Sequence, residues 1–322
     1  MGRVAAVSRL ERLIIVPRNG YANRLQAWAS AAVLARELQV PLLVAWEAES
    51  IATAPAEALF DSALIDRGFI TPAELTEILG VDHSALPRYL YEDRARGFLS
   101  LAGHDRGEQI FMRSLQERLA LPGRSSTLVI MAGGLFALPS TEDFEHRRRA
   151  FYSALPWNSG IQDRVDHALS HHSEFFAVHV RQTDRSLEAP TKRGIIAAMT
   201  TVHRTTGQSE VFLAADTASA VESWTHLAAA HGLEPWSVDL QSRDRSSAQA
   251  GIDALVDWLL LTKAKGLVYT RESSFGHEAA VAADALAMSR AVRAPALVVA
   301  ARRGRRHGHN AIQFVQRRMS RS

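Results

Sequence analysis

The residues best suited to chemistry follow a predicted buried strand at residues 175–180. Here the apolar run Phe-Phe-Ala-Val-His-Val is followed by Arg-Gln-Thr-Asp, which brings His179, Arg181 and Asp184 to the end of the strand. Ligands of open α/β sheets bind at the carboxyl ends of the strands. Because a guanidinium carries a rigid fork of donors that matches phosphate oxygens, Arg181 predicts an anionic ligand. We expect His179, within the apolar run, to be a hydrogen-bonded core residue that orients its neighbours.

Two further polar segments follow predicted strands. Residues 18–24 read Arg-Asn-Gly-Tyr-Ala-Asn-Arg and lead into a helix, whose free N–H groups and positive end favour anions. The candidates here are Gly20, Asn23 and Arg24, although a turn with a polar helix start would explain the same pattern. Asp216 follows the strand 211–215 and either contacts a ligand or caps the next helix, the role that its spacing favours.

A third segment, residues 270–276, reads Thr-Arg-Glu-Ser-Ser-Phe-Gly and also leads from a strand into a helix. Its two serines, Ser273 and Ser274, and the N–H groups of the helix start can bind phosphate oxygens, and simple helix capping by serine is the alternative. On the preceding helix, Asp253 and Asp257 lie one turn apart among leucines and valines. Each carboxylate therefore needs either a charged or hydrogen-bonding partner or contact with solvent.

Other kinds of chemistry are poorly represented in the sequence. The chain has no cysteine, which removes thiol nucleophiles, disulfides and cysteine-ligated metals. Its histidines lack ligand spacing with carboxylates, and the sequence contains no Gly-x-Ser-x-Gly elbow and no Walker loop. We therefore predict no metal site and no bound cofactor.

The candidate residues need an α/β framework to position them. The first half predicts a strand at 13–16, a helix at 22–38, a strand at 42–46, mostly helical residues at 57–121 and a strand at 127–132. The turn-rich residues 156–160 indicate a domain junction. The second half then predicts helices at 161–169, 218–231, 252–263 and 275–288, and strands at 175–180, 211–215, 237–240, 267–270 and 296–300. Such alternation is typical of a parallel, doubly wound sheet.

Length and charge complete the expectations. With 322 residues and 47% hydrophobic content, the chain is long enough for two domains. No apolar run predicts a membrane span, and residues 1–13 lack the apolar core of a secretory signal, so we expect a cytoplasmic protein. The net charge of +3 resides in the tail, since no acidic residue follows Asp284. Because such a basic run is typical of a solvated end and lacks interleaved aromatic residues, we do not expect nucleic-acid binding.

Together these segments resemble the fucosyltransferase superfamily, which includes bacterial nodulation α1,6-fucosyltransferases, protein O-fucosyltransferases and plant xyloglucan fucosyltransferases. Four motifs carry the resemblance in order and spacing: Asn19-Gly-Tyr-Ala-Asn-Arg24, His179-Val-Arg-Gln-Thr-Asp184, the strand ending at Asp216, and Ala254-Leu-Val-Asp257 followed by Ser273-Ser-Phe275. The resemblance implies a GT-B fold, in which two Rossmann-like domains face each other across a cleft. The expected domains are residues 1–156 on the acceptor side and 157–301 for the GDP-sugar, followed by a basic tail at 302–322.

The resemblance also implies roles for residues of the second half. Arg181 would grip the β-phosphate of the donor. His179 and Asp216 are further candidates for donor binding. Asp257 would lie near the guanine or ribose, and the loop from Ser273 through Ser274 to Phe275 would hold phosphate and nucleoside.

In the first half, Asn23 would face the sugar beside Gly20. Many relatives have a second arginine where this chain has Gln182, so one phosphate contact is either lost or supplied by Arg24 or Arg185. Asp184 is one candidate for the general base, together with acidic residues of the first half.

The predicted function is an inverting, metal-independent glycosyltransferase that moves L-fucose from GDP-fucose to a hydroxyl of a glycan, peptide or small molecule. Arg181 and the helix starts would stabilise the negative charge of the leaving GDP. The alternatives are a transferase for another nucleotide-activated sugar and a nucleotide-sugar-binding protein without catalysis. No motif in the sequence identifies the acceptor, the stereochemistry of the sugar or the oligomeric state.

Overall fold

The computed structural model describes residues 10–80, 89–92, 97–100, 115–117, 119, 127–138, 141–181, 190–240, 247–271 and 273–300. Three residues of the sequence predictions, Gln182, Asp184 and Arg185, lie outside this part of the chain, as does the basic tail at 302–322. The chain forms two compact units: Met1–Ser170 with Leu240–Leu259, and His171–Asp239 with Leu260–Ser322.

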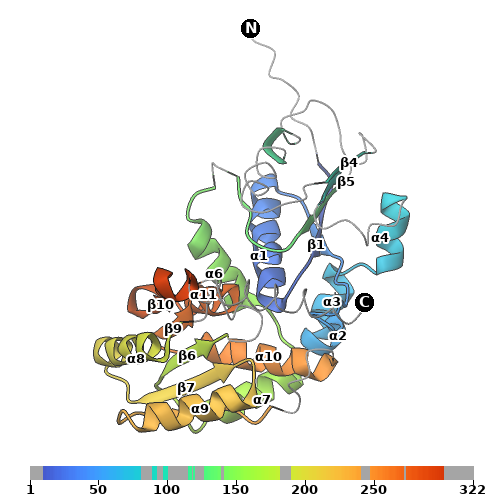
Figure 1. The fold of residues 1–322 in the computed structure, drawn as a ribbon. Helices are drawn as coiled ribbons and strands as arrows, with labels where there is room; N and C mark the ends of the chain where they lie inside the picture. Colours follow the sequence, from blue (N-terminus) through green and yellow to red (C-terminus); the bar gives the residue numbers. More distant parts are fainter. Residues whose placement is uncertain are drawn as a thin grey trace, which may run out of the picture. The chain divides into compact units, whose positions relative to one another are not determined.

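The first unit is built on a five-stranded sheet in the order β2-β1-β5-β3-β4. Figure 1 labels three of these strands, β1, β4 and β5. Its strands are β1 (Arg12–Pro17), β2 (Leu42–Val44), β3 (Tyr89–Glu92), β4 (Gly97–Ser100) and β5 (Thr127–Ala132). β1 pairs in parallel with β2 and β5, whereas β3 pairs antiparallel with β4 and β5. The three strands predicted for this half are confirmed, and the helical pattern predicted for 57–121 is wrong at β3 and β4.

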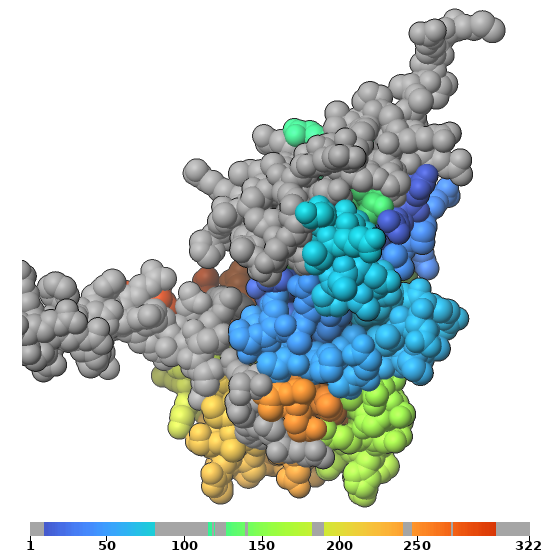
Figure 2. Space-filling model, turned by 90° about the vertical axis from the view of Figure 1, so that its right-hand side faces the viewer, coloured from blue at the N-terminus to red at the C-terminus, as the bar shows by residue number. Residues whose placement is uncertain are grey.

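The helices of the first unit are α1 (Tyr21–Leu38), α2 (Ala56–Leu59), α3 (Ser62–Gly68), α4 (Pro72–Leu79), α6 (Phe144–Ala154), α7 (Ser159–Leu169) and most of α10 (Ala248–Leu261). α4 begins as predicted, with Thr71 and Glu74 forming a capping box around Pro72. Figure 2 shows α2, α3 and α4, coloured blue to cyan, as a continuous part of the surface of this unit.

Aromatic residues fill the core beneath these helices. The Trp28 ring, on α1, makes edge contacts with Phe60 at 5.1 Å, Phe69 at 5.4 Å and Phe151 at 5.4 Å between ring centroids. Edge-to-face rings at such distances add to the stabilisation from apolar burial. Trp28 therefore holds α1, and the turn that precedes it, against several distant segments of the chain.

α10 packs with the first unit although it comes late in the sequence. Its Trp258 is 1% exposed and contacts the rings of Tyr152 and Trp157 at 5.6 and 6.1 Å. Asp253 pairs with Arg164 of α7 at 2.7 Å. For these reasons the boundary falls after Ser170 rather than at residue 156, and α7 and most of α10 leave the range 157–301 that was predicted for the second domain.

The second unit has an all-parallel sheet in the order β10-β9-β6-β7-β8. Its elements are β6 (Phe176–Val180), α8 (Lys192–Thr206), β7 (Glu210–Ala215), α9 (Ala218–Ala229), β8 (Glu234–Trp236), β9 (Leu267–Thr270), α11 (Ser274–Ala282), the 3₁₀ helix η1 (Leu286–Met288) and β10 (Arg290–Val292). Figure 1 shows α8 and α9, in yellow, beside β6 and β7.

The parallel sheet predicted for the second half is confirmed, with two corrections. The short strand predicted at 237–240 lies earlier, at β8, and residues 296–300 are helical rather than a strand. The last strand of the sheet is β10 instead. One apolar core joins β6, β7 and β9 to the inner faces of α8 and α9, so the central strand β6 is held rigidly.

Candidate functional site

Three strands of the second unit end side by side. In the register of the sheet, Val180 of β6 lies opposite Ala215 of β7, and His179 lies opposite Tyr269 of β9. The next residues along the chain are Arg181, Asp216 and Arg271, one after each strand. The sheet therefore brings two arginines and an aspartate to one edge, where open α/β sheets bind ligands.

Helices begin at the same edge, because each follows one of these strands. Side-chain oxygens cap all three starts: Thr191 accepts from Gly194 N at 3.1 Å in α8, Thr217 from Ala220 N at 3.2 Å in α9, and Ser273 from Gly276 N at 3.5 Å in α11. Three helix N-termini give this edge a positive field that favours anions.

The caps settle two of the alternatives left by the sequence. Thr217 caps α9, so the capping role favoured for Asp216 is wrong, and the half-buried Asp216 side chain lies at the strand end itself. Ser273 is 1% exposed and does cap α11. Ser274 and Phe275 follow it in the first turn of the helix and are half-buried.

His179 is the core residue that its position predicted. It is 8% exposed, and its Nδ1 lies 3.5 Å from the Ser273 hydroxyl. Its ring lies against the Phe275 ring, with 4.9 Å between centroids. His179 thus connects the end of β6 to the start of α11 and fixes the loop between β9 and α11 relative to Arg181.

Gly276 lets α11 approach the sheet closely. A Cβ at this position would lie 2.5 Å from Tyr269 Cβ and 3.3 Å from His179 Nδ1, so a larger residue does not fit. The Tyr269 hydroxyl is 3.2 Å from His277 Nδ1, and burial, with the charge of Glu278, raises the pKa of Tyr269. The sequence predictions did not include Gly276, although a glycine directly after Ser-Ser-Phe was the available signal.

The first unit carries the other predicted residues, Gly20, Asn23 and Arg24, at the start of α1. Gly20 occupies the N-cap position without a side-chain cap, and Asn23 is half-buried in the first turn. Arg24 is fully buried, and its donors point to protein oxygens: Nε to Asn19 O at 2.8 Å and Nη1 to Glu47 O at 2.7 Å. In this arrangement Arg24 braces the turn, and a phosphate contact would require it to leave these partners.

The two aspartates of α10 differ in surroundings. Asp253, 1% exposed, has the partner that its apolar helix required, because it accepts from Arg164 at 2.7 Å and from Gln249 at 3.0 Å. Asp257 lies one turn later, in the first unit, and is 8% exposed.

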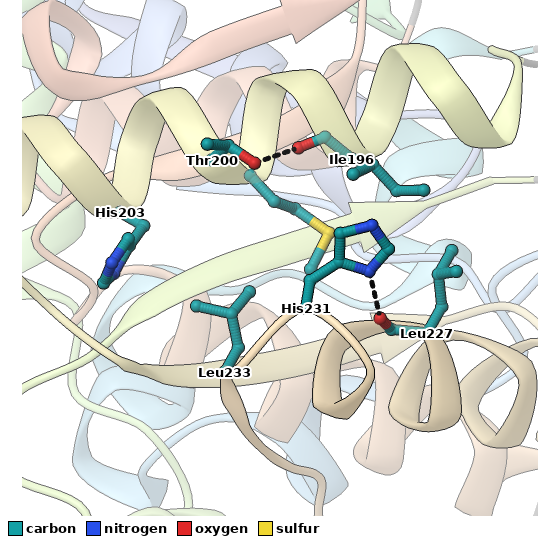
Figure 3. Close-up of a pocket in the computed structure, with 7 residues that line it drawn as sticks. Ile196, Thr200, His203, Leu227, His231 and Leu233 are labelled. Carbon is teal, nitrogen blue, oxygen red and sulfur yellow. Dashed lines mark hydrogen bonds between the residues drawn. The ribbon is translucent and has the colours of Figure 1, made fainter.

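A small pocket lies between α8 and α9 of the second unit (Figure 3). Met199, His231 and Leu233 contribute to its lining, and the His231 Nδ1 is satisfied by the Leu227 carbonyl at 2.9 Å. His231 and Leu233 lie between α9 and β8, toward the amino ends of the strands, and Met199 lies in the middle of α8. The pocket is therefore separate from the strand-end site.

In the part of the chain that the structure describes, every helix is too short or too polar to span a membrane. Among the same residues, no three histidine, aspartate or glutamate side chains are grouped so that they could hold a metal ion.

The comparisons with known proteins give matches in structure only. No family model and no curated protein matches the sequence. NodZ, a fucosyltransferase from Bradyrhizobium, is similar over 84% of this chain and 92% of its own, with 18% identity and a TM-score of 0.58.

Two further solved structures are similar. POFUT1 in complex with GDP matches over 90% of this chain and 98% of its own, with 14% identity and a TM-score of 0.51. A variant of FUT1 from Arabidopsis thaliana in complex with GDP matches over 86% of this chain and 69% of its own, with 15% identity and a TM-score of 0.55. NodZ has also been solved after soaking with GDP-fucose. The chain therefore has a fucosyltransferase-like fold, as its motifs predicted.

Proposed function

We propose that this protein is a glycosyltransferase that uses a GDP-sugar, with GDP-fucose as the first donor to test, and transfers the sugar to a hydroxyl with inversion. The similar structures support this proposal, because they are fucosyltransferases solved with GDP or GDP-fucose. The GT-B arrangement of two domains, the absence of an obligatory metal and a cytoplasmic location are parts of the same proposal.

The observation that carries the proposal is the carboxyl edge of the sheet in the second unit. The central strand β6 delivers Arg181 there, next to the starts of three capped helices. Arginine binds two phosphate oxygens at once, and helix N-termini provide N–H groups that already point outward. This combination suits a nucleoside diphosphate better than a neutral ligand.

The same groups would assist the chemical step. Departure of GDP from the sugar develops negative charge on the β-phosphate, and fixed donors stabilise such charge without having to reorganise. Arg181 would contribute most, because its charge lies on a rigid strand end. His179 would act indirectly, by holding Ser273 and Phe275 at the start of α11.

The remaining roles are proposed from the family resemblance. Asn23 would face the sugar from the start of α1, and Asp257 would lie near the guanine or ribose. Asp216 at the end of β7 would contribute to donor binding. For the general base, Asp184 is proposed as one candidate.

The direct experiment is incubation of the protein with GDP-fucose, GDP-mannose, GDP-glucose and UDP-glucose, with release of the nucleoside diphosphate as the readout. We expect release from a GDP-sugar and none from UDP-glucose, with water as the acceptor when no glycan is added. Release from GDP-mannose alone would assign a different donor sugar. Tight binding of GDP-fucose without release, even with a panel of glycan acceptors, would indicate a binding protein without catalysis. If the protein binds neither GDP nor any of these nucleotide sugars, the proposal is contradicted.

A further inference from the structure

The turn between β1 and α1 is held in an unusual conformation. Asn19 has φ of 70°, in the left-handed region, and its side-chain amide donates to the Gly133 carbonyl at 3.4 Å. A Cβ on Gly133 would lie 2.8 Å from Asn19 Cγ and 2.9 Å from the Arg18 carbonyl oxygen. The end of β5 therefore presses against this turn, and asparagine is one of the few non-glycine residues that adopt the left-handed region readily.

Arg24 braces this turn through its buried side chain. Its side chain is 0% exposed, with Nε donating to Asn19 O at 2.8 Å and Nη1 donating to Glu47 O at 2.7 Å. Its Nη2 lies 3.2 Å from a carboxylate oxygen of Glu49, and the guanidinium lies 5.0 Å from the centroid of the Trp46 ring. One side chain thus connects the turn, the start of α1 and the segment after β2.

The charges around Arg24 are balanced. Arg18 pairs with Glu47 at 3.0 Å and also with Glu49, so two arginines face two glutamates. Burial lowers the pKa of Arg24, and the charge of Glu49 opposes this shift. Buried ion pairs add little net stability compared with apolar residues of the same volume. We therefore interpret the buried Arg24 as a residue that specifies one geometry of the turn. The planar guanidinium fork fits that role, because Nε and Nη1 donate in two fixed directions while Nη2 lies against the Glu49 carboxylate.

The position of Asn23 depends on the turn that Arg24 braces. It precedes Arg24 in the first turn of α1, and the Arg24 backbone N–H donates to Gly20 O at 3.0 Å, which closes that turn around Asn23. The direction of the Asn23 amide therefore depends on the same turn that the Arg24 side chain holds.

We propose that Arg24 is a positioning residue, which fixes the first turn of α1 so that Asn23 is presented in one orientation. This inference rests on the proposed function, in which Asn23 acts on the sugar. It replaces the direct phosphate contact considered for Arg24 with an indirect role through its neighbour.

A double-mutant cycle tests the coupling between the two residues. We would measure kcat and KM for GDP release from GDP-fucose in wild type, Arg24→Lys, Asn23→Ala and the double variant. Lysine keeps the charge but lacks the fork, so kcat should fall by about tenfold or more while KM changes by less than about threefold. In the Asn23→Ala background, Arg24→Lys should then change kcat by less than about twofold. A tenfold loss in both backgrounds would overturn the inference.

Arg147→Lys is the matched control. Arg147 also pairs with a glutamate, Glu37 at 2.5 Å, and donates to a carbonyl of α1, Val33 O at 3.3 Å, but at the opposite end of that helix. The same substitution there should leave kcat unchanged. An equal loss of kcat in Arg147→Lys would mean that damage to α1 in general, rather than at its first turn, explains the effect.

A second readout does not depend on activity. Amide hydrogen exchange of peptides covering residues 18–24 should be about fivefold faster or more in Arg24→Lys than in wild type, and unchanged in Arg147→Lys. If Arg24→Lys does not fold, Glu49→Gln, which removes the charge partner, should show the same faster exchange. Wild-type exchange in a folded Arg24 or Glu49 variant would overturn the positioning role. Faster exchange in a protein that never releases GDP would sustain that role and contradict only the proposed function.

Discussion

Replacement of Gly276 by alanine tests how α11 is seated on the sheet of the second unit. The added Cβ would lie 2.5 Å from Tyr269 Cβ, and neither atom can move by side-chain rotation. Alanine favours a helix over glycine by about 0.5–1 kcal/mol, whereas overpacking in a filled core costs about 1–3 kcal/mol. The balance is a net loss of stability of about 1–2 kcal/mol, which lowers the melting temperature by about 2–3 °C in a chain of this size.

The same change should weaken GDP binding, because the helix can relieve the overlap only by moving away from β9. That movement displaces Ser273 and Phe275, which His179 otherwise holds at the strand end. We expect a loss of GDP affinity of about tenfold by calorimetry, or about 1.4 kcal/mol. Gly68→Ala is the control, since its Cβ would make only an ordinary contact, 3.7 Å from Leu64 Cδ1. If Gly276→Ala melts and binds GDP as the wild type does, α11 is not seated as described and the reasoning about its start fails.

Three more predictions concern packing, pH and metals. Gly251→Ala should destabilise the protein by about 1–3 kcal/mol in denaturant unfolding, because its Cβ would lie 2.7 Å from Tyr21 Cζ. Tyr21→Phe should also lower the free energy of unfolding by about 1–3 kcal/mol, because it removes the hydroxyl that accepts from the Ala54 N–H at 3.0 Å. In a protein that already carries Gly251→Ala, the same substitution should lower it by less. Strictly additive losses in the double variant would contradict this packing. Hydrogen bonds from Thr71 lower the pKa of Glu74 in the folded protein. The ionised Glu74 side chain therefore stabilises the start of α4 at pH values above its pKa in the unfolded chain. This stabilisation is lost as the pH falls through the lower pKa of the folded protein. Exchange of α4 amides, corrected for intrinsic rates, should therefore accelerate in acid for wild type and not for Glu74→Gln. GDP release should persist in excess EDTA, and complete loss restored by Mg²⁺ or Mn²⁺ would refute metal independence.

Buried parallel strands were the most predictable part of the fold. β6, β7 and β9 each appear in the sequence as a short apolar run that ends in a polar residue, so both the strand and its ligand-facing end were visible. Residues 296–300, Ala-Leu-Val-Val-Ala, also look like such a strand but are helical, and the edge strand β10 has only three residues. Short apolar runs do not separate strand from helix by periodicity, and tertiary pairing decides between them.

The candidate site was predictable where one segment carries the signal. Arg181 stands at a strand end in the sequence itself, and the sheet places it there. Thr217 and Asp216 are adjacent residues that both favour capping, and only the backbone register shows that Thr217 is the cap. The burial of Arg24 was not predictable, since arginine is rarely fully buried and its partners Glu47 and Glu49 come from a distant segment.

Titration of GDP into the wild type and into Arg181→Ala by calorimetry tests the central claim most directly. Removal of a charge-assisted phosphate contact should cost about 1.5–3 kcal/mol, which is about a tenfold to 150-fold loss of affinity. Arg181→Lys should recover part of this loss, because it keeps the charge without the fork. Arg204→Ala, an exposed arginine in the last turn of α8, should bind GDP as the wild type does. Equal affinity of Arg181→Ala and wild type for GDP, with both proteins folded, would contradict the placement of the nucleotide site at the end of β6.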